Sequence, residues 1–301
     1  SVCYLRAQLW KEPSSMKTRK LGYTDLHLTT VGLGTWAIGG SGWAGGWGPQ
    51  DDAESIAAIQ RALDVGVNWI DTAAVYGLGH AEEIVGKAIS GRRDEVIVAT
   101  KCGLVWEEGS TSPYGKLKAE SVRKEAEASL GRLNVEVIDL YQIHWPNPEI
   151  PLNETFKALN ELLEKKLIRY MGVSNFTVEE MIEAKKLSST QTACNQVEYN
   201  ILFREPEKNG VLKFCQENNI ILTAWKPLDR KRVLSNATII KIAQKYNATP
   251  AQIAINWLIR KRNVITIPMS LNASHLKENL YAPDIKLSKK DITSLNLLCT
   301  N

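Results

Sequence analysis

"NWIDTAAVYG", residues 68–77, begins as an apolar strand and ends as a polar loop. The largely apolar run from Val65 to Ile70 stops at Asp71, and Tyr76 follows five residues later beside a glycine. Taken alone, a carboxylate that ends a buried strand is more often a strand-end cap, and a nearby tyrosine a surface aromatic residue. A functional interpretation therefore depends on what the rest of the chain places beside these two residues.

The stretch belongs to a set of eight short β-rich runs that alternate with longer helical patterns. These runs are VGLGTW (31–36), VNWIDTA (67–73), VIVATKC (96–102), VIDLYQIHW (137–145), YMGVSNF (170–176), ACNQVEYN (193–200), IILTAWKPL (220–228) and VITIPMS (264–270). Between two of them, apolar residues recur at helical spacing at Phe156, Leu159, Leu163 and Leu167. TVEE (177–180) and TPAQ (249–252) predict capping boxes, and KLGYTDLHLTT (20–30) predicts a hairpin before the first run.

Eight β-then-α units with near-continuous apolar strands predict parallel pairing, with the helices outside the sheet. The simplest closed arrangement is an α/β fold, a (β/α)8 TIM barrel with an N-terminal β-hairpin, whose usual size of about 250 residues fits the chain from Met16. An open doubly wound sheet is the alternative, but no GxGxxG follows the first run. The sequence has no long linker, so we expect residues 16–301 to form a single barrel domain and residues 1–15 to be a leader or an expression remnant.

The composition excludes several classes of function. The chain has 301 residues, of which 23% are charged and 44% hydrophobic, as is usual for a globular protein in water. The charge of +4 is spread along the chain, so nucleic acid is not an expected partner, and no apolar run approaches the roughly 18 residues of a membrane helix. Five widely spaced cysteines without a CxxC pair indicate free thiols in a reducing compartment, so we expect a cytoplasmic protein without a zinc site.

A barrel gathers its reactive side chains on the face where the strands end. Asp71 ends the second run and Tyr76 lies in the loop above it, while Lys101 ends the third run and His144 ends the fourth. Each residue alone has an ordinary explanation, since a strand-end lysine is usually solvated and a lone histidine usually satisfies a structural hydrogen bond. Their arrival at one rim from three neighbouring strands favours a catalytic set over unrelated residues.

Charge indicates what these four side chains can do. A free tyrosine has a pKa near ~10, and a lysine ammonium a few ångströms away lowers that value. We expect Asp71 to pair with Lys101 and to hold it charged, and His144 to direct a carbonyl oxygen toward Tyr76. Such a set suits protonation of an oxygen while a hydride, which no side chain supplies, arrives from a cofactor.

Eight motifs together resemble those of the aldo-keto reductase superfamily, in order from about Lys17 to the C-terminus. They are GLGTW, DTAAVYG, ATK, IDLYQIHWP, GVSNF, NQVEYN, AWKPL and IPMSLNASHLKEN. The resemblance implies reduction of aldehydes or ketones to alcohols with NAD(P)H, by a catalytic tetrad of Asp71, Tyr76, Lys101 and His144. Tyr76 would be the general acid in reduction and the base in oxidation. The expected partner is a small-molecule carbonyl substrate, and we expect a monomer or a weak homo-oligomer.

The resemblance also implies a path for the cofactor, bound in extended form without a Rossmann fold. The residues near the nicotinamide would be Thr35, Trp36 and Asp71, with its carboxamide bound by Ser174, Asn175 and Gln196 and its ring stacked on Trp225. The pyrophosphate would follow Lys226, Pro227 and Leu228, and the adenosine end would meet Ser270, His275, Glu278 and Asn279. Simpler interpretations stay open for some of these residues: Trp225 as a core residue, and Ser174 and Asn175 as caps of the helix that starts near Thr177.

Two features depart from the pattern of the superfamily. Many members place a lysine and an arginine on the 2′-phosphate of NADP where this chain has Met269 and His275, although Ser270 and Asn272 can still donate hydrogen bonds. NADP(H) is therefore the expected cofactor, with NAD(H) as the alternative. The connection KPLDRKRVLSNATII after the seventh run is short, so either this loop is short in the protein or residues are absent from the sequence.

The expected substrate pocket has aromatic walls, which favour medium-sized aldehydes or ketones. Its residues would be Trp36, Tyr76, Trp106, His144 and Trp145, with Trp43 and Trp47 of the glycine-rich loop 39–49 as further candidates. A second hypothesis is a redox-sensing or regulatory subunit that shares the fold and the cofactor site but turns over little substrate. A metal site is not expected, because the four histidines form no HxH or HExxH motif.

Overall fold

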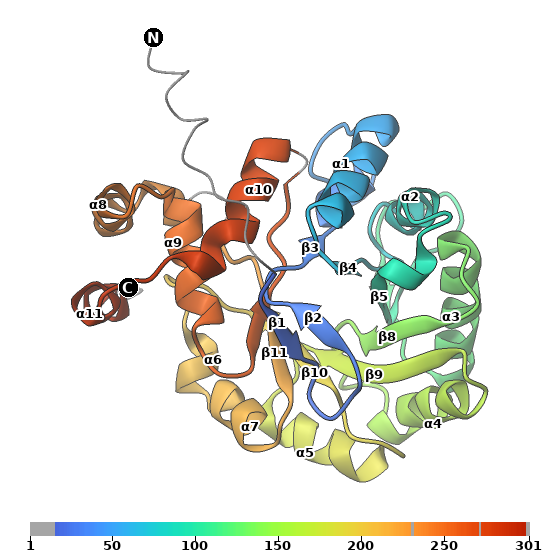
Figure 1. The fold of residues 1–301 in the computed structure, drawn as a ribbon. Helices are drawn as coiled ribbons and strands as arrows, with labels where there is room; N and C mark the ends of the chain where they lie inside the picture. Colours follow the sequence, from blue (N-terminus) through green and yellow to red (C-terminus); the bar gives the residue numbers. More distant parts are fainter. Residues whose placement is uncertain (1–15, 230–231, 271, 299–301) are drawn as a thin grey trace.

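A computed structural model describes residues 16–229, 232–270 and 272–298 of the chain. The predicted hairpin is present, because β1 (Thr18–Lys20) pairs antiparallel with β2 (His27–Thr29). Its apolar side chains are buried, and Figure 1 shows the hairpin lying across the middle of a ring of helices. The predicted leader, residues 1–15, falls outside the described residues, and the single-domain organisation stays a prediction.

The described residues form an eight-stranded sheet in which every pair of neighbouring strands is parallel. In sheet order its strands are β3 (Leu33–Gly34), β4 (Trp69–Asp71), β5 (Ile97–Cys102), β8 (Ile138–Ile143), β9 (Ile168–Ser174), β10 (Cys194–Glu198), β11 (Ile221–Trp225) and β12 (Val264–Thr266). Each strand lies within one of the predicted runs or overlaps it. The two edges meet, since Gly32 N donates to Thr266 O at 2.8 Å and Thr266 N donates to Thr30 O at 3.1 Å. The predicted (β/α)8 barrel is therefore confirmed.

Helices follow the strands and cover the outside of the barrel (Figure 1). They are α1 (Asp52–Asp64), α2 (His80–Ala88), α3 (Ala119–Leu133), α4 (Leu152–Glu164), α5 (Val178–Leu187), α6 (Glu205–Lys208), α7 (Val211–Glu217), α8 (Ala237–Lys245), α9 (Pro250–Ile259), α10 (Ala273–Tyr281) and α11 (Lys289–Asn296). Short 3₁₀ turns lie at η2 (Trp36–Gly39), η3 (Arg93–Glu95), η5 (Val233–Ser235) and η6 (Ala282–Asp284). A small antiparallel pair, β6 (Leu104–Val105) and β7 (Tyr114–Gly115), extends from the end of β5.

The local signals in the sequence explain where these helices begin and which face they bury. Both predicted capping boxes are present, with Thr177 starting α5 and Thr249 starting α9, so the first backbone N–H groups of each helix are satisfied. Phe156 and Leu159 are buried on the inner face of α4, which follows from their helical spacing. A second apolar cluster fills the interior of the barrel on the side of the hairpin. There Trp69 packs among the hairpin leucines and donates from Nε1 to Thr29 O at 2.8 Å.

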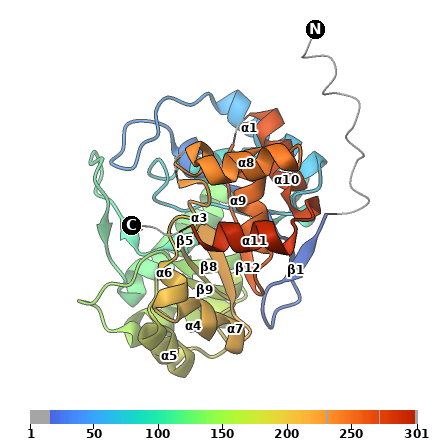
Figure 2. The ribbon, with the colours of Figure 1, turned by 90° about the vertical axis from the view of Figure 1, so that its left-hand side faces the viewer.

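The two ends of the barrel differ. Figure 2 shows the hairpin at one end and the long loops of residues 39–49 and 103–118 at the other, where the strands end. These two loops are joined, since Ala44 N donates to Thr111 O at 2.9 Å. The second apolar cluster closes the end of the barrel that carries the hairpin. The strand ends that carry polar side chains lie at the opposite end, with the long loops. Among the described residues, no helix combines the length and the apolar character that crossing a membrane requires.

Candidate active site

Asp71 and Lys101 form an ion pair inside the barrel, at the ends of the neighbouring strands β4 and β5. Lys101 Nζ lies 2.6 Å from Asp71 Oδ2, and both side chains are almost completely buried. The ammonium also donates to Thr72 O at 2.9 Å and to the Tyr76 hydroxyl at 3.2 Å. Burial lowers the pKa of Lys101, but the charge of Asp71 and the hydrogen bonds to Asp71 and Tyr76 outweigh it, so the pKa is raised and the ammonium stays charged. The predicted pairing is present.

Two glutamine side chains hold the other oxygen of Asp71. Gln196 Nε2 donates to Asp71 Oδ1 at 2.8 Å, and Gln142 Nε2 approaches the same oxygen at 3.4 Å. Gln142 in turn accepts from the Cys194 thiol at 3.2 Å. Sequence reasoning placed Gln196 on a carboxamide and did not single out Gln142. The signal for Gln142 was available, because it is a polar residue inside the apolar run of β8, two positions before His144.

Tyr76 is fixed above this pair by its own backbone and by a close contact between two loops. Tyr76 N donates to Ala73 O, and Tyr76 O accepts from Ala81 N in the first turn of α2, both at 3.1 Å. Gly77 has a φ of +63° and lies against Gly39, where a Cβ on Gly39 would lie 2.5 Å from Gly77 N. Only glycines permit this approach, so the loop that carries Tyr76 packs directly on η2.

The Tyr76 ring faces His144 and Trp43. Its centroid lies 5.7 Å from the His144 ring in an edge-to-face arrangement and 6.3 Å from the Trp43 ring. The rings of Tyr76 and His144 are half-buried, whereas Lys101 behind them is enclosed. The described residues therefore bring all four predicted tetrad members together, with the Trp43 ring beside that of Tyr76.

The charge states of Tyr76 and His144 follow from burial. Burial raises the pKa of Tyr76, and the Lys101 charge opposes this only in part, so the pKa is raised. The expectation of a lowered Tyr76 pKa was wrong, because desolvation of the phenolate outweighs the attraction of one ammonium that Asp71 already partly neutralises. Burial, followed by the charge of Lys101, holds the pKa of His144 well below its usual range. The site thus contains a protonated phenol and a neutral imidazole.

Side chains from β9, β10 and β11 extend the polar network beyond the tetrad. Asn175 Nδ2 donates to His144 O at 3.1 Å, and Asn175 Oδ1 accepts from Trp225 Nε1 at 3.2 Å. Ser174 Oγ donates to Gln196 O at 2.7 Å. Thr177 is the residue that caps α5, so the interpretation of Ser174 and Asn175 as helix caps is wrong. Trp225 is half-buried and hydrogen-bonded to this network, which argues against a simple core residue.

On the other side of the tetrad, Thr35 bonds to the end of β4, because its N and its Oγ1 both lie 3.0 Å from Asp71 O. Trp36 begins η2, and its ring lies 5.2 Å from that of Trp47. Thr35 therefore lies against the tetrad at the end of β3 and Trp36 follows it, and their place near the nicotinamide stays a prediction.

The residues predicted for the distal part of the cofactor lie on two other segments. Lys226, Pro227 and Leu228 directly follow β11, and the Lys226 ammonium lies 2.8 Å from Glu198 Oε1. The adenosine candidates lie before and along α10 in the order Ser270, His275, Glu278 and Asn279. Next to them, Met269 Sδ accepts from Ala37 N at 3.2 Å. The connection from β11 to α8 contains residues 230–231, which lie outside the described part of the chain.

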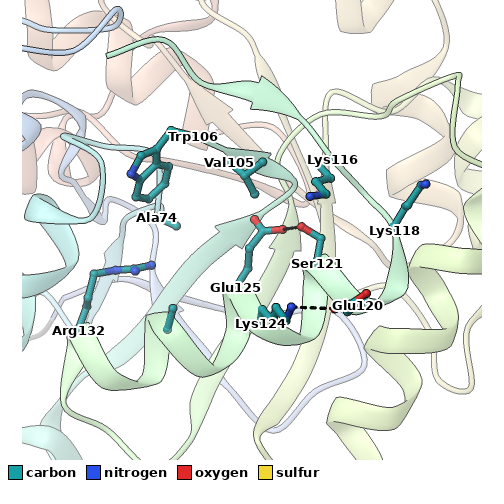
Figure 3. A pocket seen from close by; sticks show the side chains of 11 residues that line it. Ala74, Val105, Trp106, Lys116, Lys118, Glu120, Ser121, Lys124, Glu125 and Arg132 are labelled. Carbon is teal, nitrogen blue, oxygen red and sulfur yellow. Dashed lines mark hydrogen bonds and ion pairs between the residues drawn. The ribbon is translucent and has the colours of Figure 1, made fainter. Parts of the chain in front are cut away.

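Trp106 and Trp145 are the remaining residues predicted for the substrate pocket. Trp145 is 47% exposed. Trp106 borders a depression of about 360 Å³ between the end of β5 and α3, shared with the carboxylate of Glu125 and the guanidinium of Arg132 (Figure 3). Burial raises the pKa of Glu125 to about 7, although Gly103 N donates to it at 2.7 Å. The place of Trp106 and Trp145 in a substrate pocket stays a prediction.

The described residues contain no group of three or more His, Cys, Asp or Glu side chains that could hold a metal ion. The polar network offers a different fit. Gln196 uses its Nε2 on Asp71, which leaves Oε1 for an N–H group, and Asn175 and Ser174 lie beside it. Amide groups and the Trp225 indole next to a phenol match a planar ring that carries a carboxamide, as in a nicotinamide.

A barrel whose strand ends carry an Asp–Lys–Tyr–His set beside a network of amide side chains is typical of a cofactor-dependent oxidoreductase. A model of the aldo/keto reductase family matches residues 30–298, and the chain belongs to this family. Aldo-keto reductase YhdN of Bacillus subtilis is 41% identical over 217 residues, covering 71% of this chain and 63% of that protein. The alignment thus spans less than two thirds of that relative. The NADH-specific methylglyoxal reductase of Escherichia coli is 32% identical over 321 residues, covering 92% of this chain and 97% of that protein.

Solved structures agree with the family and the fold. The thermostable aldo-keto reductase Tm1743, in complex with the inhibitor epalrestat, is 40% identical with a TM-score of 0.84, covering 94% of this chain and all of that one. An aldo/keto reductase from Klebsiella pneumoniae in complex with NADP and acetate is 32% identical with a TM-score of 0.80, covering 94% of this chain and 95% of that one. The family expected from the sequence motifs is confirmed.

Proposed function

We propose that this protein reduces small aldehydes and ketones to alcohols with a nicotinamide cofactor, using Tyr76 as the general acid. The observation that carries the proposal is the position of Lys101, which contacts Asp71 at 2.6 Å and the Tyr76 hydroxyl at 3.2 Å at the rim of the barrel. This arrangement supplies a phenol whose developing negative charge meets a fixed ammonium. Family membership supports the same reaction class.

The cofactor supplies a hydride to the carbonyl carbon when it is bound. Tyr76 donates its proton to the carbonyl oxygen, so that the C=O bond becomes a C–OH group and the phenolate that remains faces Lys101. The neutral His144 offers a ring N–H to the same oxygen and directs one lone pair toward Tyr76. Asp71 holds Lys101 charged and is itself held by Gln196, so none of these groups needs to reorganise during the reaction.

The residues proposed to hold the cofactor surround this set. Ser174, Asn175 and Gln196 would bind the carboxamide and Trp225 the nicotinamide ring, with Thr35 and Trp36 beside it. The segment 226–228 would follow the pyrophosphate, and Ser270, His275, Glu278 and Asn279 the adenosine end. Asn175 bonds to the His144 carbonyl and Gln196 bonds to Asp71, so both amide groups lie beside the tetrad, and this supports the first of these assignments.

NADP(H) is the proposed cofactor, with NAD(H) as the alternative. The NADP complex of the Klebsiella relative supports the first, and the NADH-specific relative in E. coli supports the second. The side chain at Met269 carries no charge for a 2′-phosphate, so the preference should rest on Ser270, Asn272 and His275. Titrating NADPH and NADH separately, with tryptophan fluorescence as the signal, decides the matter. We expect tighter binding of NADPH, and equal dissociation constants would contradict this preference.

Small carbonyl compounds such as methylglyoxal are the first substrates to assay, since the relative in E. coli is named as a methylglyoxal reductase. The Trp43 ring beside Tyr76 supports compounds with an apolar part. The buried free thiols of Cys102, Cys194 and Cys215 support a reducing compartment such as the cytoplasm.

Substitution of Tyr76 by phenylalanine tests the proposed mechanism. Tyr76→Phe removes the proton donor and keeps the ring, so kcat should fall ~10²–10⁴-fold while the NADPH dissociation constant changes little. Tyr23→Phe is the matched control, because Tyr23 donates to Thr190 at 3.2 Å near the hairpin end of the barrel. Full turnover by Tyr76→Phe would sink the mechanism. NADPH binding by the wild type without turnover of any aldehyde would favour the regulatory hypothesis instead.

A further inference from the structure

Glu82 is a completely buried carboxylate that the proposed reaction does not use. It lies in the first turn of α2, the helix that begins just after the Tyr76 loop. One of its oxygens accepts from Thr100 Oγ1 at 2.5 Å, and the other accepts from Arg132 Nε at 2.7 Å. A buried charge is costly unless it is paired and hydrogen-bonded, and here both oxygens are satisfied. The three residues form a network that joins α2, β5 and α3.

Two members of this network are sequence neighbours of residues that hold the tetrad: Thr100 is next to Lys101, and Glu82 is next to Ala81. Thr100 precedes Lys101 on β5, so the same strand carries the hydroxyl that holds Glu82 and the ammonium that meets Tyr76. Ala81, which precedes Glu82, donates from its backbone N to Tyr76 O at 3.1 Å. Glu82 therefore joins the loop that carries Tyr76 to the strand that carries Lys101.

Arg132 reaches Glu82 across the start of α2. Gly79 is the N-cap of that helix, with a φ of +103°, and a Cβ there would lie 2.8 Å from Arg132 Cδ. The guanidinium lies 6.0 Å from the Trp106 ring, and Figure 3 shows both side chains at the depression beside Ala74. The Arg132 side chain thus packs against Gly79 at the end of the loop that carries Tyr76, and its charge neutralises that of Glu82.

We propose that Glu82, held by Thr100 and Arg132, is a positioning residue that sets the distance between the Tyr76 hydroxyl and Lys101 Nζ. The inference rests on the proposed function, since it concerns the proton donor of that reaction. Glu82 touches neither of the two reacting groups. It acts through the backbone bond from Ala81 on one side and through β5 on the other.

A positioning role has a kinetic signature that a purely structural role lacks. If the network loosens, Tyr76 moves away from Lys101 and the proton transfer slows, but the cofactor residues of β9, β10 and β11 stay in place. kcat should therefore fall about 10- to 100-fold, with little change in the NADPH dissociation constant. A more distant Lys101 would also lower the pKa of Tyr76 less, while burial and the charge of Asp71 would still raise it. The pKa of Tyr76 would therefore rise, and the pH at which alcohol oxidation begins should shift upward.

Two variants test the proposal with different risks to folding. Glu82→Gln keeps an acceptor for Thr100 and removes the charge facing Arg132. Thr100→Val keeps the shape of the strand and removes one hydrogen bond, so it remains informative if Glu82→Gln does not fold. The control is Glu161→Gln, which removes the carboxylate of another interhelical pair, in which Glu161 on α4 lies 2.9 Å from Arg123 on α3.

The expected result is a fall in kcat and an upward pH shift for Glu82→Gln and a smaller change of the same kind for Thr100→Val, with wild-type kinetics for Glu161→Gln. If Glu82→Gln and Thr100→Val lose thermal stability but keep the wild-type kcat and pH profile, the positioning role is wrong. That outcome leaves the proposed function intact. Failure of the proposed function shows differently, as a wild type without turnover or a Tyr76→Phe variant with full turnover.

Discussion

Lys101 Nζ lies 2.6 Å from Asp71 Oδ2, and both side chains are buried in the barrel. A buried ion pair contributes little net stability by itself, because desolvation of the two charges offsets their attraction. The pair is therefore better explained by what it does for the third group, the Tyr76 hydroxyl, which lies 3.2 Å from the same ammonium.

Substitution of Lys101 by methionine should impair both stability and turnover. Lys101→Met leaves the Asp71 carboxylate buried without its counterion, which typically costs about 3–5 kcal/mol in the free energy of unfolding. It also removes the charge that meets the Tyr76 phenolate, so kcat should fall ~10²-fold or more. Urea unfolding and steady-state reduction measure the two effects.

The control for this variant is Lys124→Met, since Lys124 forms an exposed pair with Glu120 on α3. No measurable change in stability or kcat is expected there. Wild-type turnover by Lys101→Met would show that Tyr76 needs no cation nearby.

The pH dependence of reduction follows from the direction of two pKa shifts. Reduction needs the protonated form of Tyr76, and burial raises the pKa of this phenol above its usual value near ~10, so the proton is present throughout the neutral range. His144 has its pKa well below its usual range, first because of burial, and so it gains no charge near neutrality. kcat for reduction should therefore be constant between about pH 6.5 and 9, and alcohol oxidation, which needs the phenolate, should rise with pH. An alkaline limb of reduction near pH 7.5 would contradict the raised pKa of Tyr76.

The barrel and the tetrad could be predicted from the sequence because each depends on local patterns. The eight apolar runs and the two capping boxes identify the units, and parallel strands bring the ends of their runs to one face. Asp71, Lys101 and His144 are therefore neighbours as soon as the strand order is known.

Other features depend on the three-dimensional environment and could not be predicted in this way. The net pKa of Tyr76 is a balance between desolvation and the charge of Lys101, and the extent of burial is not contained in residue spacing. The sequence does not indicate which partner the Gln196 side chain takes, and the packed barrel brings it to Asp71. Glu82 appears in the sequence as a polar residue of an amphipathic helix, and its complete burial follows from the close approach of α2 to α3 at Gly86.

The contact between Gly39 and Gly77 yields a last prediction about the Tyr76 loop. Gly77→Ala adds a Cβ that would collide with the Gly39 carbonyl and forces alanine into a φ of +63°. Both effects push the loop away from η2, so we expect a loss of stability of about 1–3 kcal/mol and a kcat lowered ~10-fold or more as Tyr76 moves from Lys101. Gly91→Ala is the matched control, because Gly91 has a φ of +76° but no atom within 4 Å of an added Cβ. It should lose some stability through φ alone and keep its kcat. Equal kinetics in the two variants would show that the glycine contact does not position Tyr76.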